Sequence, residues 1–151
     1  GASAATANSL SNMGGLAAAS SFVSNGEGWY AIFMNHQKGE SVSFNNIVSG
    51  ALTGLTAVNA RGIYKAYTAT TPTGTFTSSI NNNSVTLEHA FFQTSILIGI
   101  YNEGIVALSS NASININNNT LLNFSVFTGG TDIVGISNSS APIALNINNN
   151  I

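Results

Sequence analysis

The stretch Ser113-Ile114-Asn115-Ile116-Asn117-Asn118-Asn119-Thr120-Leu121 decides the fold, because apolar and polar residues alternate along it as far as a run of three asparagines. Alternation with a period of two is typical of a β-strand that buries one face. The same pattern returns in Ala144-Leu145-Asn146-Ile147-Asn148, which also leads into an asparagine run. The stretch therefore predicts a strand that belongs to an internal repeat, and such a repeat indicates a stacked architecture.

Two short motifs recur along the whole chain. The first is Asn-x-aliphatic, found at Asn8-Ser9-Leu10, Asn46-Ile47-Val48, Asn83-Ser84-Val85, Asn119-Thr120-Leu121 and, in part, Asn150-Ile151. The second is a glycine followed by an aromatic or aliphatic residue, found at Gly28-Trp29-Tyr30, Gly62-Ile63-Tyr64, Gly99-Ile100-Tyr101 and Gly135-Ile136-Ser137. From asparagine to glycine the interval is 16 residues three times in succession (46 to 62, 83 to 99, 119 to 135), whereas the return interval varies.

One constant and one variable interval indicate stacked coils, in which one arc keeps its register and the other accepts insertions. We therefore predict an all-β fold, a parallel β-helix (solenoid) of about four coils of about 36 residues, with residues 1–151 as a single segment. Asparagine tolerates tight turns and can form hydrogen-bonded ladders between coils. The predicted rows are Asn46, Asn83 and Asn119, and, separately, Gly62, Gly99 and Gly135.

The repeat begins at Asn8 and its last motif stops at Asn150-Ile151, without a polar cap. Solenoids normally end in caps that cover the terminal coil. We therefore expect a part of a longer repeat protein, whose partners are neighbouring β-helix coils of the same or another chain.

A family resemblance adds to this interpretation. The run Ile116-Asn117-Asn118-Asn119-Thr120-Leu121-Leu122-Asn123, followed by a Thr/Gly-rich stretch and Val134-Gly135-Ile136, resembles the Asn-rich repeats of very large secreted or surface proteins of Bacteroidetes. Those repeats form a right-handed parallel β-helix, so the resemblance implies right-handed coils and a secreted or cell-surface location. It covers essentially the whole chain but rests on a degenerate repeat. The first repeat departs from it, with Trp29 and Tyr30 in place of the aliphatic residue.

Composition excludes several functions. Charged residues make up 5% of the chain, and the three basic ones, Lys38, Arg61 and Lys65, cannot form the basic stripe that holds nucleic acid. The absence of cysteine excludes disulfides and thiolate metal sites. No apolar run approaches the roughly 20 residues of a membrane-spanning helix.

The acidic residues do not form a catalytic pattern. They are Glu27, Glu40, Glu88, Glu103 and Asp132. Polysaccharide-cleaving β-helices need clustered carboxylates, for calcium or for acid–base work, and neither Glu103 nor Asp132 has a second acid at the matching positions of neighbouring repeats. Glu88-His89 and the distant His36 lack the spacing of a metal site. We expect no enzymatic activity, no catalytic residue, no metal and no cofactor.

The aromatic residues divide into two groups. Tyr30, Tyr64 and Tyr101 follow the repeated glycine, so we expect them to stack along the helix axis. Trp29 and Phe33 fall outside that repeat and are the candidates for weak carbohydrate contact.

The leading functional hypothesis is a structural or adhesive β-solenoid module of a secreted or cell-surface protein, with weak carbohydrate contact. One alternative is the non-catalytic part of a pectate-lyase-like polysaccharide-active enzyme. Others are a self-assembling fibre subunit and an ice-binding solenoid. An ice-binding face needs threonines repeated on every coil, and the line Thr73, Thr75 and Thr77 is not copied by the adjoining repeats.

Overall fold

The computed structural model describes residues 8–13, 29–35, 38–49, 59–67, 74–89, 96–104, 112–122, 124–126 and 132–151. All regular secondary structure in these segments is β-strand. In chain order the strands are β1 (Asn8–Met13), β2 (Trp29–Asn35), β3 (Ser41–Ser43), β4 (Asn45–Ser49), β5 (Ala60–Tyr67), β6 (Phe76–Asn81), β7 (Ser84–Thr86), β8 (Glu88–His89), β9 (Ile96–Gly104), β10 (Ala112–Asn117), β11 (Thr120–Leu121), β12 (Ser125–Val126), β13 (Asp132–Asn138) and β14 (Ala144–Asn148).

The described strands form three four-stranded sheets, with the orders β1-β4-β7-β11, β3-β6-β10-β14 and β2-β5-β9-β13, and a two-stranded sheet of β8 and β12. Every pairing is parallel. The chain visits the three larger sheets in a fixed order, for example β6, β7 and then β9, before it returns to the first as β10. We call one such circuit a coil.

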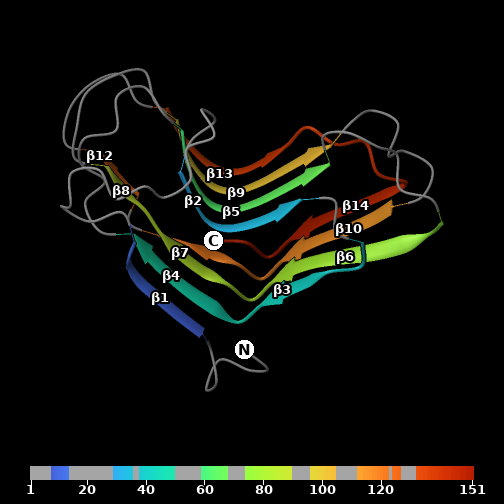
Figure 1. Ribbon diagram of the computed structural model, residues 1–151, viewed down its shortest axis with the longest axis horizontal. Coiled ribbons are helices and arrows are strands. Elements are labelled where there is room, and N and C mark those ends of the chain that lie inside the picture. The colour runs from blue at the N-terminus through green and yellow to red at the C-terminus, as the bar shows by residue number, and fades with distance from the viewer. Residues whose placement is uncertain are drawn as a thin grey trace.

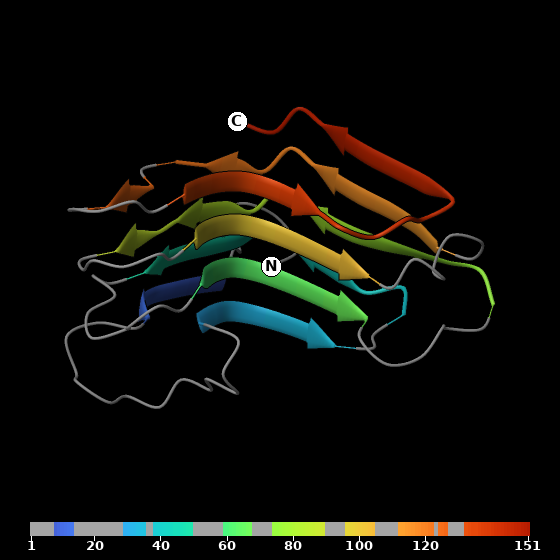
Figure 2. The ribbon, with the colours of Figure 1, turned by 90° about the horizontal axis from the view of Figure 1, so that it is seen from above.

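Figure 1 shows the three sheets surrounding a common interior, and Figure 2 shows their strands stacked from β2 at one end to β14 at the other. The predictions of an all-β fold and of parallel stacking are confirmed, and the arrangement is consistent with a parallel β-solenoid.

The core consists of aliphatic rows that run along the stack. Ile80 pairs with Ile116, and Ile63 pairs with Ile100, and all four side chains are completely buried. Burial of such a side chain stabilises the fold by about 1.5–3 kcal/mol. No single coil can enclose these residues, so the stability of each coil depends on the coils above and below it.

Tight corners separate the strands of two neighbouring sheets. The residue at each corner has a left-handed backbone, with φ between 55° and 57°, and these residues are Phe44, Asn82, Asn118 and Asn149. Asparagine adopts this conformation more readily than most residues, whereas it is strained for a bulky side chain. The middle residue of each Asn-Asn-Asn run is therefore the corner of its coil, and Phe44 is the exception.

Candidate functional site

An asparagine ladder follows each corner. The amide Nδ2 of Asn45 donates to Oδ1 of Asn83 at 2.9 Å, Asn83 donates to Asn119 at 3.0 Å, and Asn119 donates to Asn150 at 2.9 Å. The same oxygens accept the backbone N–H of the preceding rung. The predicted ladder exists, but its membership needs one correction: Asn45 forms the rung, and the predicted Asn46 is exposed and pairs with Ser84.

The amide Nδ2 of each of the three later rungs also donates a hydrogen bond to the main chain. The acceptors are carbonyl oxygens of β3, β6 and β10, at 2.8–2.9 Å. They belong to Val42 for Asn83, to Ile80 for Asn119 and to Ile116 for Asn150. Asn83 and Asn119 are buried, and an unpaired buried amide is costly. The ladder thus satisfies the polar groups that the corners leave inside the stack.

The glycine row lies within β5, β9 and β13. Gly62, Gly99 and Gly135 lie one above another, because the residues on either side of each pair in register. A Cβ on Gly62 would come within 2.7 Å of the Gly99 carbonyl oxygen, and one on Gly99 within 2.6 Å of the Gly135 oxygen. Glycine is therefore required at positions 62 and 99 by the close approach of the adjacent strand. In β2 the equivalent position is Ala31, and not the predicted Gly28, which lies outside the described residues.

This shift also adds a residue to the predicted aromatic stack of Tyr30, Tyr64 and Tyr101. Phe33 pairs with Tyr64, and Tyr64 pairs with Tyr101. The ring centroids of Phe33 and Tyr64 are 5.0 Å apart, and those of Tyr64 and Tyr101 are 5.4 Å apart with nearly parallel planes. Phe33 therefore belongs to the stack. The backbone of Tyr30 pairs with Arg61, but its ring lies 4.7 Å from that of Phe33 and 5.6 Å from that of Tyr64, so the predicted neighbourhood of Tyr30 and Tyr64 is confirmed. Trp29 lies in β2 opposite Ala60, and its side chain lies outside the described residues.

A cation covers the stack. The guanidinium carbon of Arg61 lies 4.6 Å from the Tyr64 ring centroid and 5.3 Å from that of Tyr101. The Tyr64 hydroxyl donates a hydrogen bond to Glu103. Arg61 and Tyr64 are buried, so among the stacked rings Phe33, with 40% of its surface exposed, is the most accessible. Cation–π contact and ring stacking account for this arrangement without any ligand.

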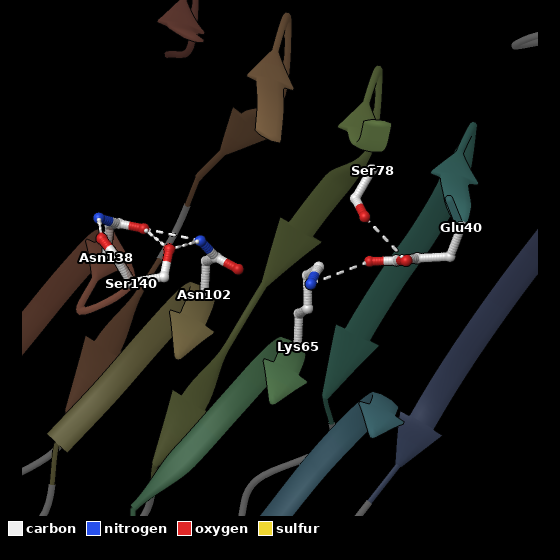
Figure 3. A network of polar contacts seen from close by, with 6 residues as sticks. All are labelled: Glu40, Lys65, Ser78, Asn102, Asn138 and Ser140. Atoms are coloured by element: carbon white, nitrogen blue, oxygen red, sulfur yellow. Dashed lines mark hydrogen bonds and ion pairs between the residues drawn. The ribbon is translucent and has the colours of Figure 1, made fainter. Parts of the chain in front are cut away.

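A buried polar cluster lies inside the stack and was not predicted from the sequence. Its members are Glu40, Lys65, Ser78, Asn102, Asn138 and Ser140 (Figure 3). Lys65 Nζ lies 3.3 Å from Glu40 Oε1, and the Ser78 hydroxyl donates to Glu40 Oε2 at 2.9 Å. Burial lowers the pKa of Lys65, and the attraction of Glu40 opposes this effect only in part.

The other half of the cluster is an amide network. Asn102 Nδ2 donates to Asn138 Oδ1 at 2.7 Å and to the Ser140 hydroxyl at 2.6 Å. Asn102 Oδ1 is buried and has no hydrogen-bond partner within the described part of the chain. Lys65 and Asn102 are direct neighbours in register, on β5 and β9. The sequence signal that could have revealed the cluster is the period-two alternation of a strand. Lys65 is two residues from the inward Ile63, so both side chains lie on the same, inner face of β5.

The described residues contain no group of three or more His, Cys, Asp or Glu side chains that could hold a metal ion. Glu27 and His36 lie outside the described residues. In the same part of the chain, no helix is long and apolar enough to cross a membrane. The threonine line does not continue up the stack, since Thr77 pairs with Ser113 and Ser113 with Ala144.

Comparison of the chain with protein-family models, curated proteins and solved structures gives no match. The stacked parallel sheets and their asparagine ladder alone therefore define the class of this protein: an all-β repeat protein whose architecture is consistent with a parallel β-solenoid.

Proposed function

We propose that this chain is a structural or adhesive β-solenoid module of a secreted or cell-surface protein, without enzymatic activity. In this proposal the coils are right-handed, as in the repeats that the sequence resembles, and they are about four in number and about 36 residues long, as the repeat intervals suggest. The partners are neighbouring β-solenoid coils of the same or another chain. Support comes from the ladder and the apolar rows, whose contacts all run along the stack.

The observation that carries the proposal is the apolar end of the stack. Ile147 occupies the same interior row as Ile116, with which it pairs, yet 41% of its surface is exposed whereas Ile116 is completely buried. Leu145, two residues earlier in β14, is similarly exposed. β14 is also the outer strand of its sheet, so its free edge can accept a further parallel strand in the way β10 accepts β14. A further coil of the same kind fits this end, because it would supply both an aliphatic row and a strand edge.

End-to-end association of the chain should therefore depend on concentration. Light scattering over a dilution series should give a molar mass that rises with concentration, and Ile147→Lys should abolish the rise because a charge would be buried between coils. The matched control is Asn146→Lys, since Asn146 alternates with Ile147 and pairs with Asn115, which lies between two buried isoleucines and is not itself buried. A monomer at every concentration, or equal effects of both variants, would contradict the proposal. A molar mass that keeps rising beyond that of a dimer would favour a fibre subunit over a module that pairs with one partner.

Weak carbohydrate contact is proposed at Phe33. Its ring is 40% exposed and is held against Tyr30 and Tyr64, so little side-chain entropy is lost when a sugar ring packs on it. Phe33→Ala should weaken binding to a soluble pectin fragment about fivefold, which corresponds to about 1 kcal/mol. Ile143→Ala, at an exposed apolar site elsewhere, should leave the dissociation constant measured by titration calorimetry unchanged. Equal binding by wild type and Phe33→Ala would exclude this surface.

A further inference from the structure

Lys65 lies in an interior row whose neighbouring coil has the uncharged Met34 at the same position. From β2 to β13 this row reads Met34, Lys65, Asn102 and Asn138. Lys65 and Asn102 are both 1% exposed, and they are directly paired on adjacent parallel strands. Their side chains therefore start from neighbouring backbone positions in the same enclosed, water-poor space.

Glu40 is positioned to take a proton from this lysine. Its carboxylate lies 3.3 Å from Lys65 Nζ and is oriented by the Ser78 hydroxyl. Two charges are unfavourable in a poorly solvated interior, whereas a neutral amine beside a neutral carboxylic acid avoids most of the desolvation cost. The lowered pKa of Lys65 acts in the same direction. A desolvated neutral lysine is a nucleophile.

Asn102 presents the matching electrophile. Its Nδ2 is held by Asn138 and Ser140, and this orientation turns Oδ1 away from them. Figure 3 shows that oxygen on the side of the amide that faces Lys65. The oxygen is buried and has no hydrogen-bond partner in the described residues, so the unreacted amide is stabilised through its nitrogen alone.

We propose that Lys65 and Asn102 form an intramolecular isopeptide bond, with Glu40 as the proton acceptor. One proton passes from the Lys65 ammonium to the Glu40 carboxylate, and the resulting amine attacks Cγ of Asn102. The new Nζ–Cγ bond forms, a second proton passes from Nζ to Nδ2, and the Cγ–Nδ2 bond breaks. Ammonia leaves, and Glu40 remains protonated until it exchanges with solvent. The reaction needs no oxidant, metal or other reactant.

The bond would join β5 to β9 and close a loop between adjacent coils. A covalent link of this kind restricts the unfolded chain in the way a disulfide does, in a protein that has no cysteine. The inference is independent of the adhesive role proposed above, because it concerns only side chains inside the stack.

The test is mass spectrometry of the purified chain. The intact mass should be lower than the sequence mass by one ammonia, and a protease digest should contain a branched peptide that links Lys65 to Asn102. The branched peptide is decisive, since cyclisation of an asparagine elsewhere also releases ammonia. Wild-type protein that retains its full mass after prolonged incubation in the folded state would overturn the proposal, as would a branch at any other pair.

Variants test the role of each group. Lys65→Met copies Met34 of the coil below, and Glu40→Gln keeps the shape of the side chain but cannot accept the proton. Both should keep the full mass while circular dichroism still reports β-structure. Lys38→Met, at an exposed lysine, should still lose ammonia and give the branched peptide. A branched peptide in Glu40→Gln would overturn the assignment of Glu40.

Discussion

Replacement of Asn83 by alanine is expected to lower the free energy of unfolding by about 3–4 kcal/mol, because several buried polar groups lose their partners at once. Asn83 Oδ1 accepts both the backbone N–H and the side-chain amide of Asn45. Its own amide donates to the Val42 carbonyl oxygen at 2.9 Å and to Asn119. In the alanine variant the Asn45 donors and the Val42 oxygen remain inside the stack without these bonds.

The measurement is equilibrium unfolding in urea, with Asn46→Ala as the matched control. Asn46 is also an asparagine of the repeat, but it is exposed, so its removal should change the free energy of unfolding by less than about 0.5 kcal/mol. Equal losses in the two variants would show that the ladder contributes nothing beyond local turn preference. A larger loss for Asn46→Ala would restore the row that the sequence motif predicts.

The displacement of the ladder from Asn46 to Asn45 shows what the motif could and could not determine. Both Asn45-Asn46-Ile47 and Asn46-Ile47-Val48 satisfy the pattern Asn-x-aliphatic. The ambiguity is resolved by packing, because Ile47 must pair with the buried Val85. An alignment anchored on the aliphatic residue would have selected Asn45. The period-two strands and the parallel stacking could be predicted because many residues report them together.

The first repeat was misaligned for a different physical reason. The position of β2 that lies opposite Gly62 holds Ala31, so the first repeat has no glycine there for the motif to match. The sequence motif therefore selected Gly28 and left Phe33, which pairs with Tyr64 in register, out of the aromatic stack. The polar cluster around Lys65 was missed because lysine and glutamate are ordinarily surface residues. Only the register, which places Lys65 between Met34 and Asn102, reveals that the pair is enclosed.

Gly99→Ala is expected to destabilise the protein by about 2–3 kcal/mol through overpacking. The added Cβ would lie 2.6 Å from the Gly135 carbonyl oxygen and 2.8 Å from Cζ of Phe124, with Leu121 Cδ2 at 3.1 Å. The nearest of these atoms belongs to the backbone of the adjacent strand, so it cannot move aside by a change of rotamer. Relief requires β9 and β13 to separate at this position, which weakens both their hydrogen bonds and the aliphatic row beside them.

Gly135→Ala provides the control, because the same substitution in the same glycine row meets a different environment. Its Cβ would contact only Leu121 Cδ1 within 4 Å, at the ordinary van der Waals distance of 3.5 Å. Alanine restricts the unfolded chain more than glycine does, so this variant should range from no change to a gain of about 1 kcal/mol in the free energy of unfolding. Urea denaturation should therefore give changes in the free energy of unfolding that differ in sign, or at least greatly in size, between the two variants. Equal destabilisation of both variants would show that the glycines supply backbone flexibility and that the approach of the next strand is not the reason for them.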